Sequence, residues 1–336
     1  MIDQSSLEKF DVQGMYKVYD KWPEIARQHY EEDFTEIDFG EITHVVFGGM
    51  GGSGTIGDVF ASILSKTNIH VEVVKGYLLP KTVDSKSLIV ITSASGNTEE
   101  TLSILDSAFK IKCKIIAFSG GGKMQEYCNK KGLNYRQIPM IHSPRASFPA
   151  FLFSILKTLE SILPIEKTDI INSLNELEKQ RDSISSNNLN HNNPAINIAE
   201  SISEIPVIYY PWGLQAAAIR FKNCLQENAK IHAMSEDVIE ACHNGIVSWS
   251  KDSKVKPILV RGKDDYVKTK QRYEILKEYF EEEEIDYKEI FSVSGSILSK
   301  LINLIYFCDY TSIYRAILTE IDPTPVKAIN FVKERL

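Results

Sequence analysis

Apolar residues in the first half of the chain form short runs that alternate with segments of helical periodicity. Continuous apolar runs at residues 43–47, 87–92 and 114–119 predict buried strands, whereas residues 55–64 and 98–110 carry apolar side chains at helical spacing. Strands that alternate with helices at this spacing indicate βαβ units, whose connections make the strands parallel. The pattern therefore predicts an α/β fold with mostly parallel sheets.

A polar run at residues 185–194, rich in Asn and Ser, interrupts this pattern. Such side chains hydrogen-bond their own backbone and favour turns, so the run is typical of a boundary. A strand, a glycine turn and a helix then begin again at residues 205–230, as in the first half. We therefore predict two α/β domains, over residues 1–184 with an N-terminal helical extension and over residues 185–336 with C-terminal helices.

The length and charge of the chain fit this division and narrow the function. At about 150 residues per domain, 336 residues suggest two domains. The net charge of −7 argues against a nucleic-acid partner, because such proteins usually carry a clustered basic excess. The most apolar stretch contains Lys157 and Glu160 and is too short to span a bilayer, so no membrane association is expected.

The cysteines and the first residues indicate the compartment. Five scattered cysteines without a CxxC pair make a disulfide framework or a zinc ribbon unlikely and fit a reducing cytoplasm. The start of the sequence has no basic region before an apolar core, so we expect no signal peptide. No grouping of His, Asp and Glu shows metal-ligand spacing along the sequence, and we expect neither a metal nor another cofactor.

The sharpest chemical signal is the segment S-A-S-G-N-T at residues 93–98, between a strand and a helix that opens with two glutamates. The hydroxyls of Ser93, Ser95 and Thr98, together with the free N–H groups of a helix start, suit a phosphate. The alternative is simple helix capping by Ser95 or Asn97. Capping accounts for one or two of these residues, so the phosphate interpretation is favoured.

The glycine cluster at residues 48–54 allows two interpretations. It matches G-x-G-x-x-G after a strand and before a helix, which is the dinucleotide fingerprint. That fingerprint also needs an acidic residue at the end of the next strand, where Lys75 stands instead. A nicotinamide cofactor is therefore the alternative, and the favoured interpretation is that the glycines let the backbone approach a sugar, with Ser53 adding a hydroxyl.

Several motifs together resemble a known family. The segments at residues 51–54, 75–80 and 93–101 are similar to the sugar isomerase (SIS) domain. Further motifs resemble, more specifically, those of the bifunctional phosphoglucose/phosphomannose isomerases. They are P-R-A-S (144–147), Q-E-N-A-K (226–230), H-N (243–244) and the tail motifs D-Y-x-S-I-Y and D-P-T-P-V (309–326). The resemblance implies two doubly wound SIS-type α/β domains and a homodimer with active sites shared between subunits.

The resemblance also implies roles for individual residues. Glu227 corresponds to the base that moves a proton between C2 and C1, and Arg145 to the arginine that stabilises the enediolate. His243 corresponds to the histidine that opens the sugar ring in the neighbouring subunit's site, and Lys300 to the lysine that assists it. Here H-N is followed by Gly245 in place of the usual glutamate, for which Glu240 is a candidate substitute. Substrate contacts are expected from Gly52, Ser53, Ser93, Ser95 and Thr98.

The expected function is an aldose–ketose isomerase that interconverts glucose 6-phosphate and mannose 6-phosphate with fructose 6-phosphate through a cis-enediolate. A non-catalytic sugar-phosphate sensor would keep the hydroxyls at residues 93–98 but would need neither Glu227 nor His243. An NAD(P)-dependent oxidoreductase is disfavoured by Lys75. The alternatives therefore differ in which of these residues they require.

Overall fold

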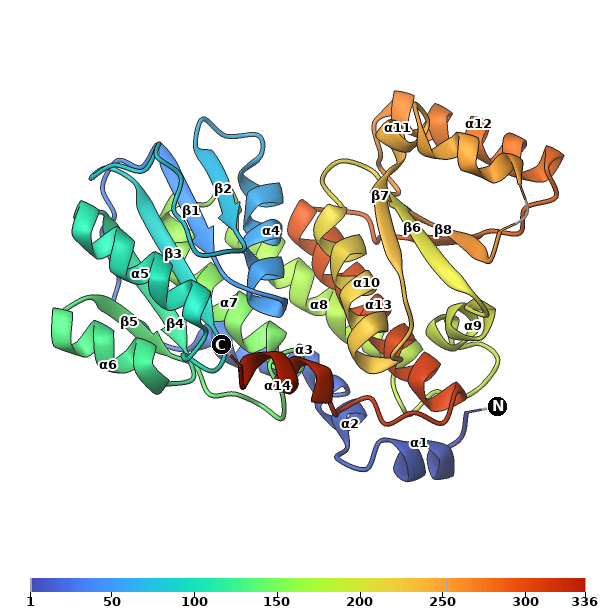
Figure 1. Ribbon diagram of the computed structural model, residues 1–336, viewed down its shortest axis with the longest axis horizontal. Helices are drawn as coiled ribbons and strands as arrows, with labels where there is room; N and C mark the ends of the chain where they lie inside the picture. The colour runs from blue at the N-terminus through green and yellow to red at the C-terminus, as the bar shows by residue number, and fades with distance from the viewer. Residues whose placement is uncertain (1, 252, 336) are drawn as a thin grey trace. The chain divides into compact units, whose positions relative to one another are not determined.

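The computed structural model describes residues 2–251 and 253–335. The chain divides into two compact units, each built on its own parallel sheet (Figure 1). The five-stranded unit comprises residues 21–174. The four-stranded unit comprises residues 2–20 together with 175–335, apart from residue 252.

The sheet of the five-stranded unit has the order β2-β1-β3-β4-β5, with every neighbouring pair parallel. Its central strands are β1 (His44–Gly48), β3 (Leu88–Ser93) and β4 (Lys114–Ser119), which are buried almost throughout. The edge strands β2 (His70–Val74) and β5 (Asn134–Gln137) are more exposed. Strands covered on both faces need continuous apolar runs, which is why these three central strands could be predicted.

Helices cover both faces of this sheet. On one face, Gly57 lies so close to β1 and β2 that an added Cβ would come 2.8 Å from Phe47 Cβ and 2.9 Å from Val73 Cγ1. On the other face, Ile104 packs in a core with Val46. The helices of this unit are α3 (Trp22–Glu31), α4 (Gly52–Leu64), α5 (Glu99–Ile111), α6 (Gly122–Lys131) and α7 (Phe148–Leu159). The prediction of a doubly wound α/β fold is confirmed.

The four-stranded unit repeats this strand order. Its sheet is arranged β7-β6-β8-β9, again all parallel, which matches β2-β1-β3-β4 of the other unit. The strands are β6 (Ile205–Tyr210), β7 (Met234–Asp237), β8 (Val255–Arg261) and β9 (Lys288–Phe291). The shared order agrees with the similarity between the two halves of the sequence.

Two layers of helices cover the four-stranded sheet. On one face, α11 (Val238–Ala241) and α12 (Val267–Glu282) form a core with the sheet, and on the other α10 (Gln215–Asn228) lies beside α13 (Ile297–Leu318) (Figure 1). The other helices of this unit are α1 (Gln4–Phe10), α2 (Met15–Tyr19), α9 (Pro194–Ser201), α14 (Lys327–Lys333) and the second part of α8 (Lys167–Ile184).

A buried ion pair joins α10 to α13. Arg220, 2% exposed, reaches Asp309, 0% exposed, with an Nη2–Oδ2 distance of 2.6 Å and Nε–O distances of 3.0 and 3.1 Å. Tyr19 donates a further hydrogen bond of 2.9 Å to the same carboxylate. Burial alone would lower the pKa of Arg220, but Asp309 outweighs it and raises the pKa above its usual value. The guanidinium of Arg220 therefore stays charged in the interior.

Residues 2–20 pack within the four-stranded unit. The hydroxyl of Tyr306 donates to the backbone oxygen of Tyr19 at 2.7 Å, and that of Tyr310 donates to Asp20 and to the backbone oxygen of Tyr16. In the division that the sequence predicts, this segment belongs to the first domain. That division, at residues 184/185, stays a prediction. The compact units themselves divide between residues 174 and 175, within α8.

Among the described residues, no helix has both the length and the apolar content to cross a bilayer. The apolar helix α7 (Phe148–Leu159) is instead buried in the five-stranded unit.

The Arg220–Asp309 pair can be tested by an isosteric change. Asp309→Asn leaves the Arg220 charge buried without its counter-ion, so we expect the free energy of unfolding to fall by about 3–5 kcal/mol in urea titrations. Glu176→Gln breaks an exposed pair with Lys179 in α8 and should cost less than about 1 kcal/mol. Equal losses in the two variants would contradict this assignment.

Candidate functional site

The two candidate phosphate loops follow neighbouring strands of the five-stranded sheet. The glycine loop follows β1 and the serine loop follows β3, and the strand order reverses direction between these two strands. In open α/β sheets, ligands bind outside the carboxyl ends of the strands at this point. The fold therefore brings the loops that carry Gly52, Ser53, Ser93, Ser95 and Thr98 to one edge of one sheet.

The serine loop is held by its own hydrogen bonds. The hydroxyl of Ser93 donates to Thr98 Oγ1 at 3.0 Å and accepts from the N–H of Gly96 at 3.1 Å. Gly96 adopts φ +67° and packs against the carbonyl of Gly121, and Met124 donates its N–H to Gly96 O at 2.9 Å. Ser93 is buried, whereas Ser95 is exposed. The loop is thus preformed, with one hydroxyl facing solvent.

No side chain of the described residues caps α5. Its N-cap residue is Thr98, which makes no side-chain capping bond. Asn97 instead accepts from the N–H of Lys123 at 3.0 Å, and Ser95 accepts from the N–H of Asn97 at 3.2 Å. Capping by Ser95 or Asn97, the alternative from the sequence, is therefore wrong. The N–H groups of the first turn remain available to an anion.

The glycine loop makes a close turn. Gly51 adopts φ +53°, and an added Cβ at Gly49 or Gly54 would lie 2.8 Å from backbone atoms of the loop. At the end of β2, Lys75 forms a 2.5 Å ion pair with Asp58 of α4. Burial raises the pKa of Asp58, an effect that Lys75 opposes. A dinucleotide-binding protein has its ribose-binding acid at this position. Here the position carries Lys75, which is ion-paired to the neighbouring helix α4.

Arg145 lies in the connection between β5 and α7 and is 5% exposed. The backbone around it is fixed, since Ser147 donates both its N–H and its hydroxyl to Ser143 O, at 3.0 and 2.8 Å. Trp22 donates from Nε1 to the carbonyl of Ala146 at 2.9 Å. The guanidinium therefore projects from a rigid segment.

Glu227 lies half-buried in the last turn of α10. Its neighbour Asn228 is fully buried and donates to Ser312 Oγ of α13 at 2.8 Å. Lys230 adopts φ +57° and donates to the carbonyls of Pro323 and Pro325, at 3.2 and 2.8 Å. The motifs Q-E-N-A-K and D-P-T-P-V, which are far apart in sequence, are therefore in contact, and both hold the backbone beside Glu227.

His243 and Lys300 occupy other parts of the four-stranded unit. His243 is exposed just after α11, and Lys300 stands in the first turn of α13, 3.3 Å from Asp264. Asn228, the neighbour of Glu227, contacts Ser312, and Lys300 precedes Ser312 by twelve residues, or about 18 Å along α13. The unit therefore does not bring Lys300 and Glu227 together. The candidate substitute Glu240 accepts from Asn244 at 2.8 Å.

Glu236 is a further candidate that the sequence did not indicate. An added Cβ at Gly245 would lie 2.9 and 3.0 Å from the two carboxylate oxygens of Glu236. Burial, with Glu240 and Asp237 contributing, raises the pKa of Glu236. A carboxylate from β7 thus lies next to the position where the family carries a glutamate. The sequence carries no local signal for this contact, because only the tertiary structure brings Glu236 beside Gly245.

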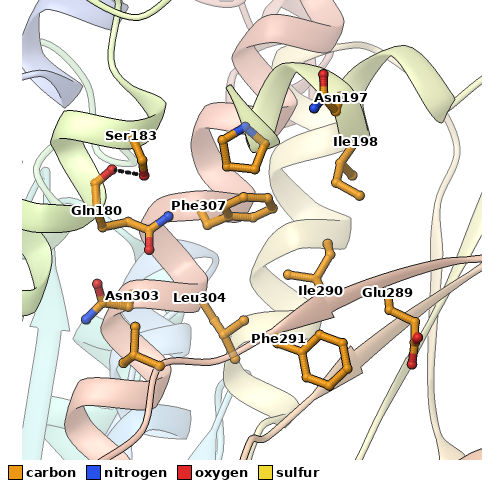
Figure 2. A pocket seen from close by; sticks show the side chains of 12 residues that line it. Gln180, Ser183, Asn197, Ile198, Glu289, Ile290, Phe291, Asn303, Leu304 and Phe307 are labelled. Atoms are coloured by element: carbon orange, nitrogen blue, oxygen red, sulfur yellow. Dashed lines mark hydrogen bonds between the residues drawn. The ribbon is translucent and has the colours of Figure 1, made fainter. Parts of the chain in front are cut away.

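A hollow of about 420 Å³ in the four-stranded unit does not contain these residues. Figure 2 shows its wall, in which Phe307, Leu304 and Ile290 face the space together with the amides of Asn303 and Gln180. The charged residue in its lining is the acidic Glu289, so this hollow does not suit a phosphate.

The comparisons with known proteins agree with the fold. A solved structure of a hypothetical protein from Thermus thermophilus superposes with a TM-score of 0.73 at 14% identity, over 98% of this chain and 91% of the other. The C-terminal domain of glucosamine-fructose-6-phosphate aminotransferase from Francisella tularensis gives 0.70 at 16% identity, over 93% and 98%. At these identities the likeness concerns the fold alone.

Residues 191–336 match the family model described as bacterial phospho-glucose isomerase C-terminal SIS domain, which gives the class. Curated relatives named bifunctional phosphoglucose/phosphomannose isomerase include those of Caldicellulosiruptor bescii, 32% identical over 88% of this chain and 90% of the relative, and Aquifex aeolicus, 30% identical over 97% of both. The chain belongs to the bifunctional phosphoglucose/phosphomannose isomerase family. Another relative, 29% identical over 70% of this chain and 73% of its own length, is a D-glucosamine-6-phosphate 4-epimerase from Sulfolobus acidocaldarius.

The close packing of the serine loop gives a matched pair of glycine variants. Gly96→Ala places a methyl group in a left-handed backbone and against the Gly121 carbonyl, whereas Gly132→Ala meets the same strain (φ +64°) in open space. We expect Gly132→Ala to lower the free energy of unfolding by about 1–2 kcal/mol and Gly96→Ala by clearly more. Chemical denaturation measures both, and equal losses would show that the loop is not closely packed.

Proposed function

We propose that this chain is an aldose–ketose isomerase that interconverts glucose 6-phosphate and mannose 6-phosphate with fructose 6-phosphate. One observation carries the proposal: an uncapped, hydroxyl-lined helix start at the switch point of a parallel sheet, in a chain that aligns with bifunctional isomerases over nearly its whole length. The C. bescii and A. aeolicus relatives carry this activity in their names.

The substrate phosphate binds to the serine loop. The hydroxyls of Ser95 and Thr98 and the N–H groups of the first turn of α5 supply donors to its oxygens, and the helix dipole favours its negative charge. Ser93 holds Thr98 in place, because its buried hydroxyl donates to Thr98 Oγ1 at 3.0 Å. Gly52 and Ser53, half-buried in the first turn of α4, approach the sugar. These groups are neutral, so the phosphate is held without a buried cation.

Glu227 transfers the proton. Its carboxylate removes the proton from C2 of the open-chain aldose, the C–H electron pair forms the C1=C2 double bond, and the carbonyl electrons move to O1, which gives the enediolate. The protonated Glu227 returns the proton to C1, while the C2 hydroxyl loses its proton and becomes the carbonyl of the ketose, and O1 is protonated. The two aldose epimers share this intermediate but carry the C2 proton on opposite faces, so one base serves both only when the intermediate rotates within the site.

Arg145 stabilises the negative charge on the enediolate oxygens, which a rigidly held guanidinium does best. His243 and Lys300 assist ring opening, in which the ring oxygen must gain a proton and the C1 hydroxyl must lose one. We also propose that the active form is a homodimer in which His243 serves the site of the second subunit. The exposure of His243 on the single chain supports this arrangement.

The role of Glu227 is tested by its amide. Glu227→Gln should lower kcat for glucose 6-phosphate and mannose 6-phosphate by at least about a thousandfold, because the amide cannot accept the C2 proton, while KM stays within a few-fold. Glu200→Gln, an exposed glutamate near the end of α9, is the matched control and should match wild type.

Coupled assays should include glucosamine 6-phosphate, because one relative is named for epimerase activity. Near-normal isomerisation by Glu227→Gln would contradict its role as base. Turnover of glucosamine 6-phosphate alone by the wild-type chain would overturn the proposed substrates.

The phosphate loop is tested by an exposed hydroxyl. Ser95→Ala removes a donor to a charged ligand and should raise KM for the sugar phosphates about tenfold, with a parallel loss in inhibition by inorganic phosphate. Ser85→Ala, another exposed serine of the five-stranded unit, should leave both constants unchanged. An unchanged KM in Ser95→Ala would exclude this hydroxyl from the phosphate site.

A further inference from the structure

Three metal-ligating side chains meet at the start of two neighbouring strands in the five-stranded unit. His44 begins β1, His70 begins β2, and Glu72 follows two residues later; one ligand atom of each lies within 4.8 Å of the others. The register pairs His44 with His70. Because side chains two residues apart share a face of a strand, all three project from the same face of the sheet.

The buried histidine is oriented as a metal ligand would be. His44 Nδ1 lies 3.2 Å from Ser87 Oγ, and the Ser87 hydroxyl donates to the carboxylate of Asp84 at 3.2 Å. Because the Ser87 hydroxyl donates its proton to Asp84, Ser87 Oγ is the acceptor for the Nδ1–H of His44. This contact assigns the tautomer of His44 whose Nε2 carries a lone pair.

That Nε2 atom is itself buried and has no hydrogen-bond partner among the described residues, and His44 as a whole is 9% exposed. A buried acceptor without a partner costs free energy, which a bound cation would recover. The rings of His44 and His70 lie close, with centroids 4.9 Å apart, while His70 is exposed and Glu72 half-buried. The latter two can rotate by the ångström or so that bonds of about 2.0–2.2 Å require.

We propose that His44, through Nε2, together with His70 and Glu72 forms a binding site for one divalent transition-metal ion of the zinc type. Two imidazoles and a carboxylate suit zinc, with water completing a tetrahedron. Spacing along the sequence does not show this grouping, because His44 stands 26 residues before His70 and only the strand register brings them together.

The site is separate from the phosphate loops. It lies at the amino ends of β1 and β2, whereas those loops follow the carboxyl ends, about 16 Å away along a five-residue strand. A metal here would join the edge strand β2 to its neighbour β1. We therefore expect the ion to stabilise the sheet rather than take part in catalysis.

The test uses the full chain, freed of metal with a chelator, reduced, and titrated with zinc alone by calorimetry. We expect one zinc per chain in the wild type and a rise in Tm on binding. His70→Gln and Glu72→Gln, both at sites that tolerate polar replacements, should each weaken binding at least about 100-fold without changing the Tm of the metal-free protein. Ser87→Ala should weaken it about tenfold, because the His44 ring loses its orienting contact.

His191→Gln, an exposed loop histidine of the four-stranded unit, is the matched control and should bind zinc as the wild type does. Cobalt provides a second readout: a tetrahedral visible spectrum without a thiolate charge-transfer band distinguishes this site from the five free cysteines. The proposal is overturned if the wild type shows no saturable zinc binding, if the variants at 70 and 72 bind zinc normally, or if cobalt reports thiolate ligands.

Discussion

The buried contact between Arg220 and Asp309 is the constraint on which the four-stranded unit depends. An arginine that leaves water must keep its charge balanced, so α10 and α13 can meet only in the register that brings these two groups together. Cys224, one turn after Arg220, adds a 3.2 Å contact to Asp309, and burial raises the pKa of its thiol well above the usual value. With this register in place, Asn228 reaches Ser312, and the final turn of α10 presents Glu227.

The two sheets share a strand order but differ at their switch points. After β3, the first sheet places neutral hydroxyls and an uncapped helix. After β8, the second sheet places Gly262 and Lys263 before Asp264 and Asp265, and Asp265 accepts from the N–H of Gly262 at 2.9 Å. Burial raises the pKa of this carboxyl, and Gly262, Arg261 and lysines oppose the change. A carboxylate takes the place that an anion would need, so this edge of the second sheet is less suited to bind phosphate than the corresponding edge of the first.

The sequence predicted the elements whose signal is local. Apolar runs located β1, β3 and β4, and the hydroxyl content of residues 93–98 located a loop at the switch point. Contacts between residues that are distant in sequence leave no such local signal and could not be predicted. The carboxylate of Glu236 beside Gly245, the packing of residues 2–20 with α13, and the register that pairs His44 with His70 all depend on tertiary structure. Helix capping by Ser95 was plausible by residue type and was excluded only by the hydrogen bonds of the loop.

The acidity of the chain is compatible with an anionic substrate because binding depends on the local field. Charges farther away than the Debye length, about 8 Å at physiological ionic strength, are largely screened, so the net charge of −7 has little effect inside a loop. The acidic residues nearest the serine loop, Glu99 and Glu100, stand in the first turn of α5, where the helix dipole stabilises them. A phosphate at the same helix end would compete with them for that field. Neutral hydroxyls that donate hydrogen bonds would favour binding of the phosphate over the interaction with these glutamates. They also add no charge that must be desolvated when the site is empty.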